Sequence, residues 1–199
     1  MSPRSEQQFL ALREKSRGRI LEAATELFAR QGYHATSISA IANAAGVSKG
    51  LMYNYFDSKE DLLDNILRKG FEDINAPMEQ LIHLQDPFER LEAIIEGAFA
   101  MVRHKQDRIH WQFLVSIMTQ HEVMKRMHSM FSKYMKAYLS TFESIFKAMQ
   151  VKNPRVESYR LAAIIDGVML HYLSLFGKSY PLDEIKEDIL DEYKKYKVA

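Results

Sequence analysis

Residues 36–60, TSISAIANAAGVSKGLMYNYFDSKE, decide the fold of this chain. In their first half, four apolar residues recur at helical intervals: Ile38, Ile41, Ala42 and Ala45. This spacing predicts a short helix over 37–45 that buries one stripe of side chains. Gly46 follows, and because glycine tolerates the left-handed conformation of a sharp helix exit, we expect the chain to turn there.

A second short helix is predicted over 48–56. Ser48 suits its N-cap, and Met52 and Phe56, four residues apart, share its inner face. The remaining side chains then face outward, and they include a lysine, a glycine, an asparagine and two tyrosines. Such a surface offers a cation and polar tips for phosphates and short side chains for base edges, so we expect it to enter the major groove of DNA.

The flanking segments complete a small three-helix head. A helix over 17–31 precedes the pair, with Gly32 just past its end, and another helix begins at Ser58. Lys59 places a cation at a helix start, which is slightly unfavourable for the helix alone and is understandable beside a DNA phosphate.

Basic residues cluster on the approach to the first helix and in its first turn: Arg4, Arg13, Lys15, Arg17 and Arg19. For Arg17 and Arg19 we predict contact with a phosphate or the minor groove, because the duplex should pass there. A solvated terminus is the alternative, and it is the favoured interpretation for Arg4.

The segment 20–63 resembles the DNA-binding head of the tetracycline-repressor-like (TetR) transcriptional regulators. The resemblance rests on residues that fall at the family's spacings: Gly32-Tyr33, Thr36, Ile41-Ala42, Ala45-Gly46-Val47-Ser48, Tyr53, Tyr55-Phe56 and Lys59-Glu60. Beyond residue 63 it rests on size, helical character and Asp166-Gly167. It implies a helix-turn-helix head followed by a helical domain that senses a ligand and dimerises.

The resemblance also implies which head residues contact DNA. Base contacts would come from Lys49, Gly50 and Leu51, and phosphate contacts from a second set: Thr36, Ser37, Ser48, Tyr53, Tyr55 and Lys59. Asn54 could serve either purpose. Leu51 departs from the small polar residue expected at its position, and an apolar side chain against a thymine methyl predicts A·T-leaning readout. The alternative is that Leu51 packs inward.

The rest of the chain predicts an all-α fold of about nine helices. Periodic apolar segments, separated at prolines and glycines, give the later helices: 58–75 with a continuation to 84, 87–104, 107–120, 123–149, 154–176 and 182–196. We therefore expect a DNA-binding domain over 1–60, including the basic N-terminal arm, and a ligand-sensing and dimerisation domain over 61–199.

Methionine and aromatic side chains are frequent after residue 63, and methionine repacks easily around an apolar guest. Together with the resemblance, this predicts a ligand pocket with the following wall: Phe99, Phe113, Ile117, Met118, Phe131, Tyr134, Met135, Tyr138, Met169 and Tyr172. The alternative for any one of them is an ordinary core position.

The last two predicted helices are expected to form a dimer contact. Small residues allow close approach and apolar residues supply surface at helical spacing: Ala162, Ala163, Gly167, Leu170, Leu173, Ile185, Ile189 and Tyr193. Asp166 lies among apolar neighbours, and a structural pairing near this contact is favoured over ligand binding. His121 and His128 lack further ligands at usual spacings, so no metal site is predicted.

Composition limits the other possibilities. The chain has 199 residues, 47% of them hydrophobic, and its 27 basic and 26 acidic residues almost balance, so bulk charge gives no argument for nucleic acid. It has no cysteine, which excludes disulfides, thiolate metal sites and cysteine nucleophiles. The longest apolar stretch, 161–176, is interrupted by Asp166, His171 and Ser174, so we predict a soluble, cytoplasmic protein without a membrane span.

The sequence therefore predicts a homodimeric repressor that leaves a palindromic double-stranded operator when it binds a small, apolar or aromatic effector. No cofactor is expected. An enzyme is not expected either, because the motifs of phosphate-binding loops and nucleophilic triads are missing from the sequence. Two alternatives stay open: a DNA-binding protein with a filled bundle that senses no ligand, or one that is regulated by a protein partner.

Overall fold

The computed structural model describes residues 6–118 and 120–196, apart from the side chains of residues 6, 7, 74, 75, 77–79, 82 and 105–107. Within these residues the regular elements are helices, as the sequence predicts: α1 (Glu6–Gln31), α2 (Ile38–Ala45), α3 (Lys49–Tyr53), α4 (Lys59–Gln80), α5 (Pro87–Met101), α6 (Lys105–Met118), α7 (His121–Ala148), α8 (Pro154–His171) and α9 (Leu182–Lys194). Short 3₁₀ turns at Leu81–His83 and Gly177–Ser179 and a π turn at Tyr172–Phe176 join them.

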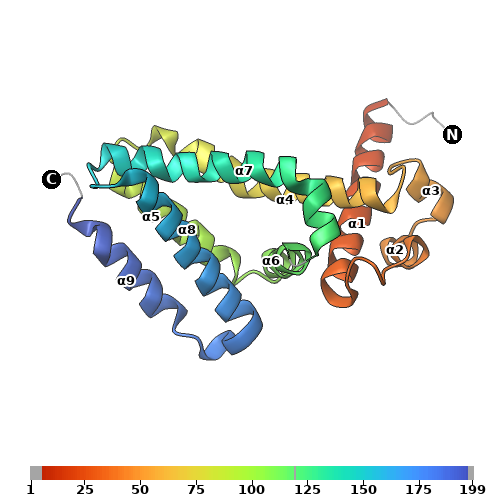
Figure 1. Cartoon of the computed structure of the whole chain (residues 1–199). Coiled ribbons are helices and arrows are strands. Elements are labelled where there is room, and N and C mark those ends of the chain that lie inside the picture. The colour runs from red at the N-terminus through yellow and green to blue at the C-terminus, as the bar shows by residue number, and fades with distance from the viewer. Residues whose placement is uncertain (1–5, 119, 197–199) are drawn as a thin grey trace.

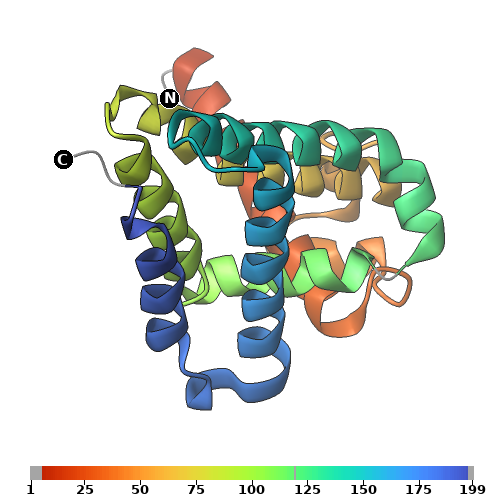
Figure 2. The ribbon, with the colours of Figure 1, turned by 60° about the vertical axis from the view of Figure 1, so that its left-hand side comes forward.

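The helices form an elongated molecule with a head at one end and a bundle at the other (Figure 1). The head contains α1, α2 and α3, and α5, α8 and α9 lie at the far end. Between them α4 and α7 run side by side, a contact seen again from another direction in Figure 2. Helix α6 crosses beneath this pair and packs on α1. The head is therefore joined to the bundle by three helices.

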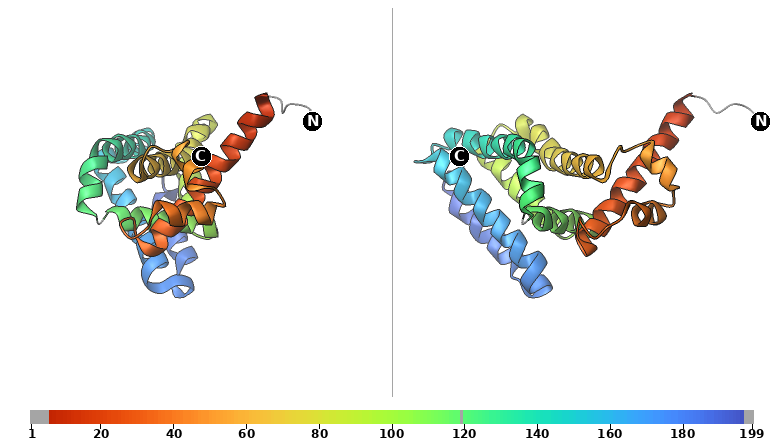
Figure 3. Two further views of the ribbon diagram at one scale, coloured as in Figure 1. Left: turned by 90° about the vertical axis from the view of Figure 1, so that its right-hand side faces the viewer. Right: turned by 45° about the vertical axis from the view of Figure 1, so that its right-hand side comes forward.

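In the head, two helices differ clearly in extent from the sequence-based expectation. Helix α1 begins at Glu6 rather than at Arg17, because the segment EQQFLALREK contains good helix formers and no breaker. Its first turns project beyond the rest of the head (Figure 3), so the expected basic arm is a helix where the structure describes it. Arg4 lies outside the described residues. Helix α3 ends at Tyr53, and Asn54 provides its C-cap.

Glycines end the helices of the head as expected. Gly46 has φ +65°, and its backbone N–H donates to the carbonyls of Ala42 and Asn43 at the end of α2. Gly32 has φ +84°, and its N–H donates to the Phe28 carbonyl, 3.0 Å away, at the end of α1. Residues that carry a side chain rarely adopt this left-handed backbone conformation without strain, which is why both turns require glycine.

Two hydrophobic cores fill the molecule. The first combines the buried residues of the head with residues of α6 and of the first half of α7: Phe113, Leu114, Ile117, Val123, Met127 and Phe131. The second lies among α5, the end of α7, α8 and α9. The packing of the head thus depends on residues far beyond position 60, and the division into domains 1–60 and 61–199 stays a prediction.

One segment of the described residues, Pro154–Ser179, is long and apolar enough to cross a membrane by length and composition alone, contrary to expectation. Its most apolar 18-residue window has a mean hydropathy of 1.3, and 28% of that window is buried. The segment packs along α7 as part of the second core. Many of its exposed apolar side chains lie on the outer face of α8, away from α7.

Candidate nucleic-acid interface and effector cavities

Helix α3 is anchored by two buried side chains, as predicted. Met52 is 1% exposed and Phe56 is 2% exposed, and both belong to the core of the head. Lys49, Gly50 and Asn54 are exposed on the opposite side, and Tyr53 is 48% exposed. The sequence therefore predicted correctly which side of this helix is buried and which is exposed.

Gly50 is not required by packing within the chain. A Cβ atom built on Gly50 would meet no atom within 4 Å, and its backbone is not in the left-handed region. A bare backbone on an exposed helix surface lets a large partner approach closely. This is the property expected beside a DNA backbone or base edge.

Serine side chains fix the starts of the head helices. Ser37 Oγ accepts from the Ala40 N–H at 3.1 Å, and Ser48 Oγ accepts from the Leu51 N–H at 3.0 Å. Ser58 Oγ accepts likewise from the Asp61 N–H. Ser37 and Ser48 remain exposed, so their helix starts can also meet phosphates.

Leu51 and Tyr55 are half-buried and so lie between the two faces of the head. The Arg13 guanidinium lies over the Tyr55 ring, 5.8 Å from its centroid. A cation over an aromatic face is favourable, so Arg13 joins α1 to the end of the α3 segment.

Thr36 does not offer its side chain to a phosphate, which corrects the expectation. It is 1% exposed, and its hydroxyl lies 2.8 Å from the Gly32 carbonyl and 3.4 Å from the Leu27 carbonyl. The hydroxyl therefore donates to the carbonyl of Gly32, just past the end of α1, and is held inside the head.

Lys59 is also assigned to the interior of the head rather than to a phosphate. Its ammonium donates to the carbonyls of Tyr33, His34 and Thr36 at 2.9, 3.3 and 3.0 Å and lies 4.6 Å from the Tyr33 ring centroid. The three N–H donors of the ammonium thus have three carbonyl acceptors. These contacts across 23 to 26 residues explain why a cation stands at the start of α4.

Arg17 faces α4 rather than open solvent. Its guanidinium donates to Asn65 Oδ1 at 2.7 Å and lies 5.7 Å from the Phe56 ring centroid. The predicted DNA contact of Arg17 is therefore not favoured. Arg19 is exposed, and its guanidinium lies 3.9 Å from the position of a Cβ on Gly46, beside the turn between α2 and α3.

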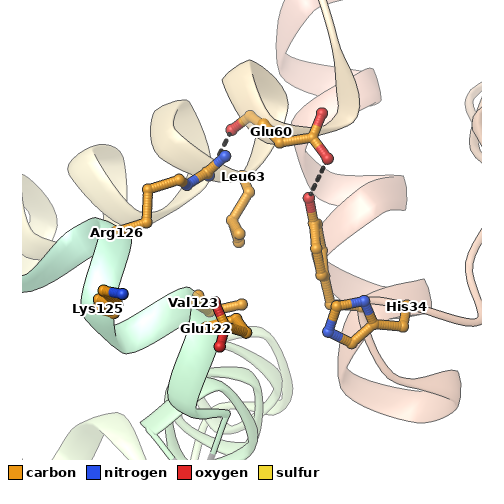
Figure 4. A pocket seen from close by; sticks show the side chains of 8 residues that line it. His34, Glu60, Leu63, Glu122, Val123, Lys125 and Arg126 are labelled. Atoms are coloured by element: carbon orange, nitrogen blue, oxygen red, sulfur yellow. Dashed lines mark hydrogen bonds between the residues drawn. The ribbon is translucent and has the colours of Figure 1, made fainter.

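The head meets the first turns of α7 at an open cleft of about 510 Å³ (Figure 4). On its head side the Tyr33 hydroxyl donates to Glu60 at 3.0 Å, and burial, with help from Glu60, raises the pKa of Tyr33. The Glu60 carboxylate accepts hydrogen bonds from its own backbone and from the Tyr33 hydroxyl, and both lower the pKa of Glu60. Arg126 on α7 reaches across to Asp64 at 2.6 Å and to the Glu60 carbonyl at 3.2 Å.

Sequence reasoning missed this junction. Arg126 is separated by 62 residues from Asp64 and by 66 from Glu60, so no local spacing could connect them. The sequence shows Glu60 and Asp64 in the first turns of α4, but only the packing of α7 beside α4 reveals that Arg126 contacts this segment. Arg126 links α7 to the start of α4, beside the head, by charge.

The predicted ligand wall is divided between the two cores. Phe113, Ile117, Phe131 and Tyr134 pack in the first core, and another group packs in the second: Phe99, Tyr138, Met169 and Tyr172. The structure contradicts the prediction for the other two, since Met118 is 52% exposed and Met135 is 38% exposed. These side chains leave the interior because the stripe of each helix that faces a core is narrower than its set of apolar residues.

A small cavity of about 50 Å³ lies where α4, the end of α5 and α6 meet. Its lining includes only one residue of the predicted wall, Phe113, together with seven others: Ile66, Gly70, Asp73, Met101, His110, Trp111 and Leu114. The cavity joins residues of the first core to Trp111, which packs against the second.

The expected dimer residues separate into two groups. Ile189 and Tyr193 are buried in the second core of their own chain, and Leu173 and Ile185 pack against it. Ala162 is also buried within the chain, so these five positions are corrected. Ala163 and Leu170 are exposed and Gly167 is half-exposed on the outer face of α8. The same face carries Val156, 65% exposed, and Tyr159, 54% exposed.

Helix α9 packs on α5 through its buried apolar side chains, and a polar cluster also connects it to α8. Arg160 pairs with Glu157 and with Glu192 at 2.6 Å, and the Tyr193 hydroxyl donates to Glu157. Burial would raise the pKa of Glu157, but the hydrogen bonds from Arg160 and Tyr193 outweigh it and lower the pKa. In Figure 3 α8 and α9 run antiparallel.

Comparison with known proteins agrees with this architecture. Residues 20–66 match the family model of bacterial regulatory proteins of the tetR family. The transcriptional activator FasR of Mycolicibacterium smegmatis is 36% identical over 93 residues, 46% of this chain and 42% of that protein. The fatty acid metabolism regulator protein of Bacillus subtilis is 28% identical over 130 residues, 63% of each chain.

A solved structure gives the same fold. The transcriptional regulator FadR from Bacillus subtilis, in complex with stearoyl-CoA, superposes with a TM-score of 0.73 at 23% identity, over 88% of this chain and 96% of that one. The sequence matches are shorter, and the chain spans about half the length of the curated relatives that it matches. Family model, relatives and architecture agree: this chain carries the DNA-binding head of the tetR family and has the fold of TetR-like regulators.

Proposed function

We propose that this protein is a transcriptional repressor that binds double-stranded operator DNA through α3 and the start of α2. The observation that carries the proposal is the exposed surface of Lys49, Gly50, Tyr53 and Asn54 above the buried Met52. It combines a cation, polar tips and a bare backbone. A regulator of this kind acts on chromosomal DNA, so we place it in the cytoplasm.

Selection of duplexes from a random pool with the purified protein tests this proposal. We expect an enriched palindrome with half-sites one helical turn or a multiple of it apart. Tyr53→Ala should weaken binding to all duplexes, while Leu51→Thr should change the preferred base at one position. Failure to enrich any sequence, with Tyr53→Ala binding like the parent, would reject α3 as the reading element.

The palindrome requires a homodimer, and the outer face of α8 supports one. Its exposed apolar residues, with Leu170 at 41% exposed, form the kind of surface that soluble proteins cover with a partner. Sedimentation analysis should show a dimer for the parent and a monomer for Leu170→Glu. The same substitution at Ala148, exposed on α7, is the control and should remain dimeric.

We further propose that a largely apolar effector releases the protein from its operator. The Bacillus subtilis relative is named for fatty acid metabolism, and the FadR neighbour holds stearoyl-CoA, so acyl compounds are the first class to try. Helix α4 runs from the head to the bundle, so a ligand that favours another position of α4 changes the separation of two heads.

Titration of stearoyl-CoA and a panel of apolar compounds into an operator-binding assay tests the effector. A typical coupling of about 1–3 kcal/mol predicts a loss of operator affinity of about 5- to 150-fold. Unchanged affinity across the panel would favour the alternative of a filled bundle, which the division of the predicted wall between two cores also supports.

A further inference from the structure

A chain of hydrogen bonds joins the segment after α3 to both α4 and α1. In that segment the Asp57 N–H donates to Asp61 Oδ2 at 3.0 Å, and Asn65 Nδ2 donates to Asp61 Oδ1 at 2.9 Å. Asn65 Oδ1 in turn accepts from the Arg17 guanidinium at 2.7 Å, across 48 residues of sequence. The segment that leaves α3 is therefore held by two other helices.

Asn65 is the central link of this chain because its side chain both donates and accepts. Its Nδ2 donates to the backbone carbonyl of Asp61 at 2.8 Å as well as to the Asp61 carboxylate. Its Oδ1 faces an arginine, which can only donate. A carboxylate at position 65 would keep the bond to Arg17 and lose the bonds to Asp61, and an apolar side chain would lose both.

Two arginines one turn apart on α1 contact the same segment. The Arg17 guanidinium lies 5.7 Å from the centroid of the Phe56 ring, and that of Arg13 lies 5.8 Å from the centroid of the Tyr55 ring. A cation over an aromatic face is favourable. Phe56 is also buried in the core of the head, so α1 holds the end of the α3 segment through both charge and packing.

Helix α3 needs such support because it has only five residues. A helix of this length is not stable alone, so its direction depends on what surrounds it. Base contacts require side chains placed to within about 0.5 Å, whereas phosphate contacts from flexible cations tolerate a small rotation. A loosened α3 should therefore lose discrimination between sequences before it loses affinity for DNA.

We propose that Arg17, Asn65 and Asp61 are positioning residues for operator recognition. They fix the direction of α3 and thereby determine how well the protein distinguishes its operator from other duplexes, without touching DNA themselves. The proposal rests on the DNA-binding function proposed above and adds residues that act through α3.

Binding to the selected operator and to a random duplex, measured in parallel, tests the proposal. Arg17→Met and Asn65→Ala should each lower the preference for the operator by about 10-fold, the effect of one hydrogen bond to a charged group. Binding to the random duplex and its salt slope should stay those of the parent, because no phosphate contact is lost. A slope lowered by about one in Arg17→Met would assign Arg17 to a phosphate and overturn the proposal.

The ratio of the two affinities separates positioning from stability, since partial unfolding weakens binding to both duplexes alike. Two matched controls should keep the ratio of the parent. Gln80→Ala removes an exposed amide at the end of α4, and Arg30→Met removes an exposed arginine of α1 that pairs with Glu26 of its own helix. A fall in the ratio in these controls equal to that in Arg17→Met would overturn the proposal.

A double variant tests whether the residues act as one chain. Because Arg17 and Asn65 bond to each other, combining Arg17→Met with Asn65→Ala should lower the preference no further than either change alone. Losses that multiply would reject the chain. If Arg17→Met or Asn65→Ala does not fold, Asn65→Asp replaces it: the side chain has the same size, and the preference should fall because the bonds to Asp61 are broken. An unchanged preference in Asn65→Asp would also reject the chain.

Failure of this proposal and failure of the DNA-binding function give different results. If Tyr53→Ala weakens operator binding while Arg17→Met and Asn65→Ala keep the preference of the parent, the positioning role is rejected and the DNA-binding function stands. If no duplex is enriched and Tyr53→Ala binds like the parent, both are rejected.

Discussion

The head and the bundle differ in what fixes their side chains. In the head, Ser37, Gly46 and Ser48 begin or end helices through contacts within five residues, and Met52 and Phe56 follow from one helical repeat. In the bundle, residues with equal hydrophobicity go to different places, as the exposed Met118 and the buried Met169 demonstrate. A surface set by local contacts can be predicted from sequence, whereas a surface set by packing between helices cannot.

The head and the bundle are not fully separate, because the first core contains residues of both. Phe28 on α1 lies 5.2 Å from the Tyr33 ring and 6.0 Å from the Phe113 ring of α6, measured between centroids. Head and bundle should therefore lose structure together. The predictions below test how far the two regions are independent.

Phe28→Ala is expected to have the largest effect. Phe28 is completely buried, and its loss should lower the free energy of unfolding by about 3–5 kcal/mol. Urea unfolding followed by Trp111 fluorescence and by circular dichroism should shift to the same midpoint. Phe9→Ala on the same helix, at a 60% exposed residue, should change it by less than about 0.5 kcal/mol. An unshifted Trp111 transition would show that the head unfolds independently of α6.

Lys59→Met and Lys49→Met distinguish a structural cation from a DNA-binding one. Because Lys59 satisfies three carbonyls, Lys59→Met should cost about 2 kcal/mol of unfolding free energy and leave the salt dependence of DNA binding unchanged. Lys49→Met, at an exposed residue, should preserve stability and lower the salt slope by about one. The reverse pattern would return Lys59 to a phosphate contact.

Arg126→Met tests the connection between the two regions. Its ion pair with Asp64 is partly exposed, so stability should fall by less than about 1 kcal/mol. Operator affinity measured with and without stearoyl-CoA should nevertheless show weaker coupling, because α7 no longer bonds to the start of α4. Lys125→Met, at the adjacent exposed residue, is the control. Equal coupling in both variants would exclude Arg126 from the mechanism.

Glu60→Gln should have the smallest effect, and the effect should depend on pH. The pKa of Glu60 is lower in the folded protein than in the unfolded chain, so its stabilising contribution is complete above about pH 4.3 and is lost as the pH falls through the folded pKa. The carboxylate is exposed, which keeps the contribution below about 1 kcal/mol. Parent and variant should differ in thermal midpoint at pH 7 and converge under acid; a difference that persists in acid would contradict this account.

The helical fold, the turn at Gly46 and the outward side of α3 could all be predicted from sequence, because the chain segments that determine them are adjacent. The position of α9 could not. Ile189 and Tyr193 have the spacing of an interface stripe, but α9 packs on α5 and buries both residues in the second core of its own chain. Similarly, Lys59 looked like a phosphate ligand until the turn after α1 supplied its carbonyls.

The sequence by itself determined the all-α fold, the helix-turn-helix head and the outward residues Lys49, Gly50 and Tyr53, since helix caps and apolar repeats act over a few residues. Only the tertiary structure decided that Arg17 and Lys59 serve the head itself and that Arg126 joins the start of α4 to α7. These assignments depend on which helices come together, and no local pattern records a partner more than twenty residues away.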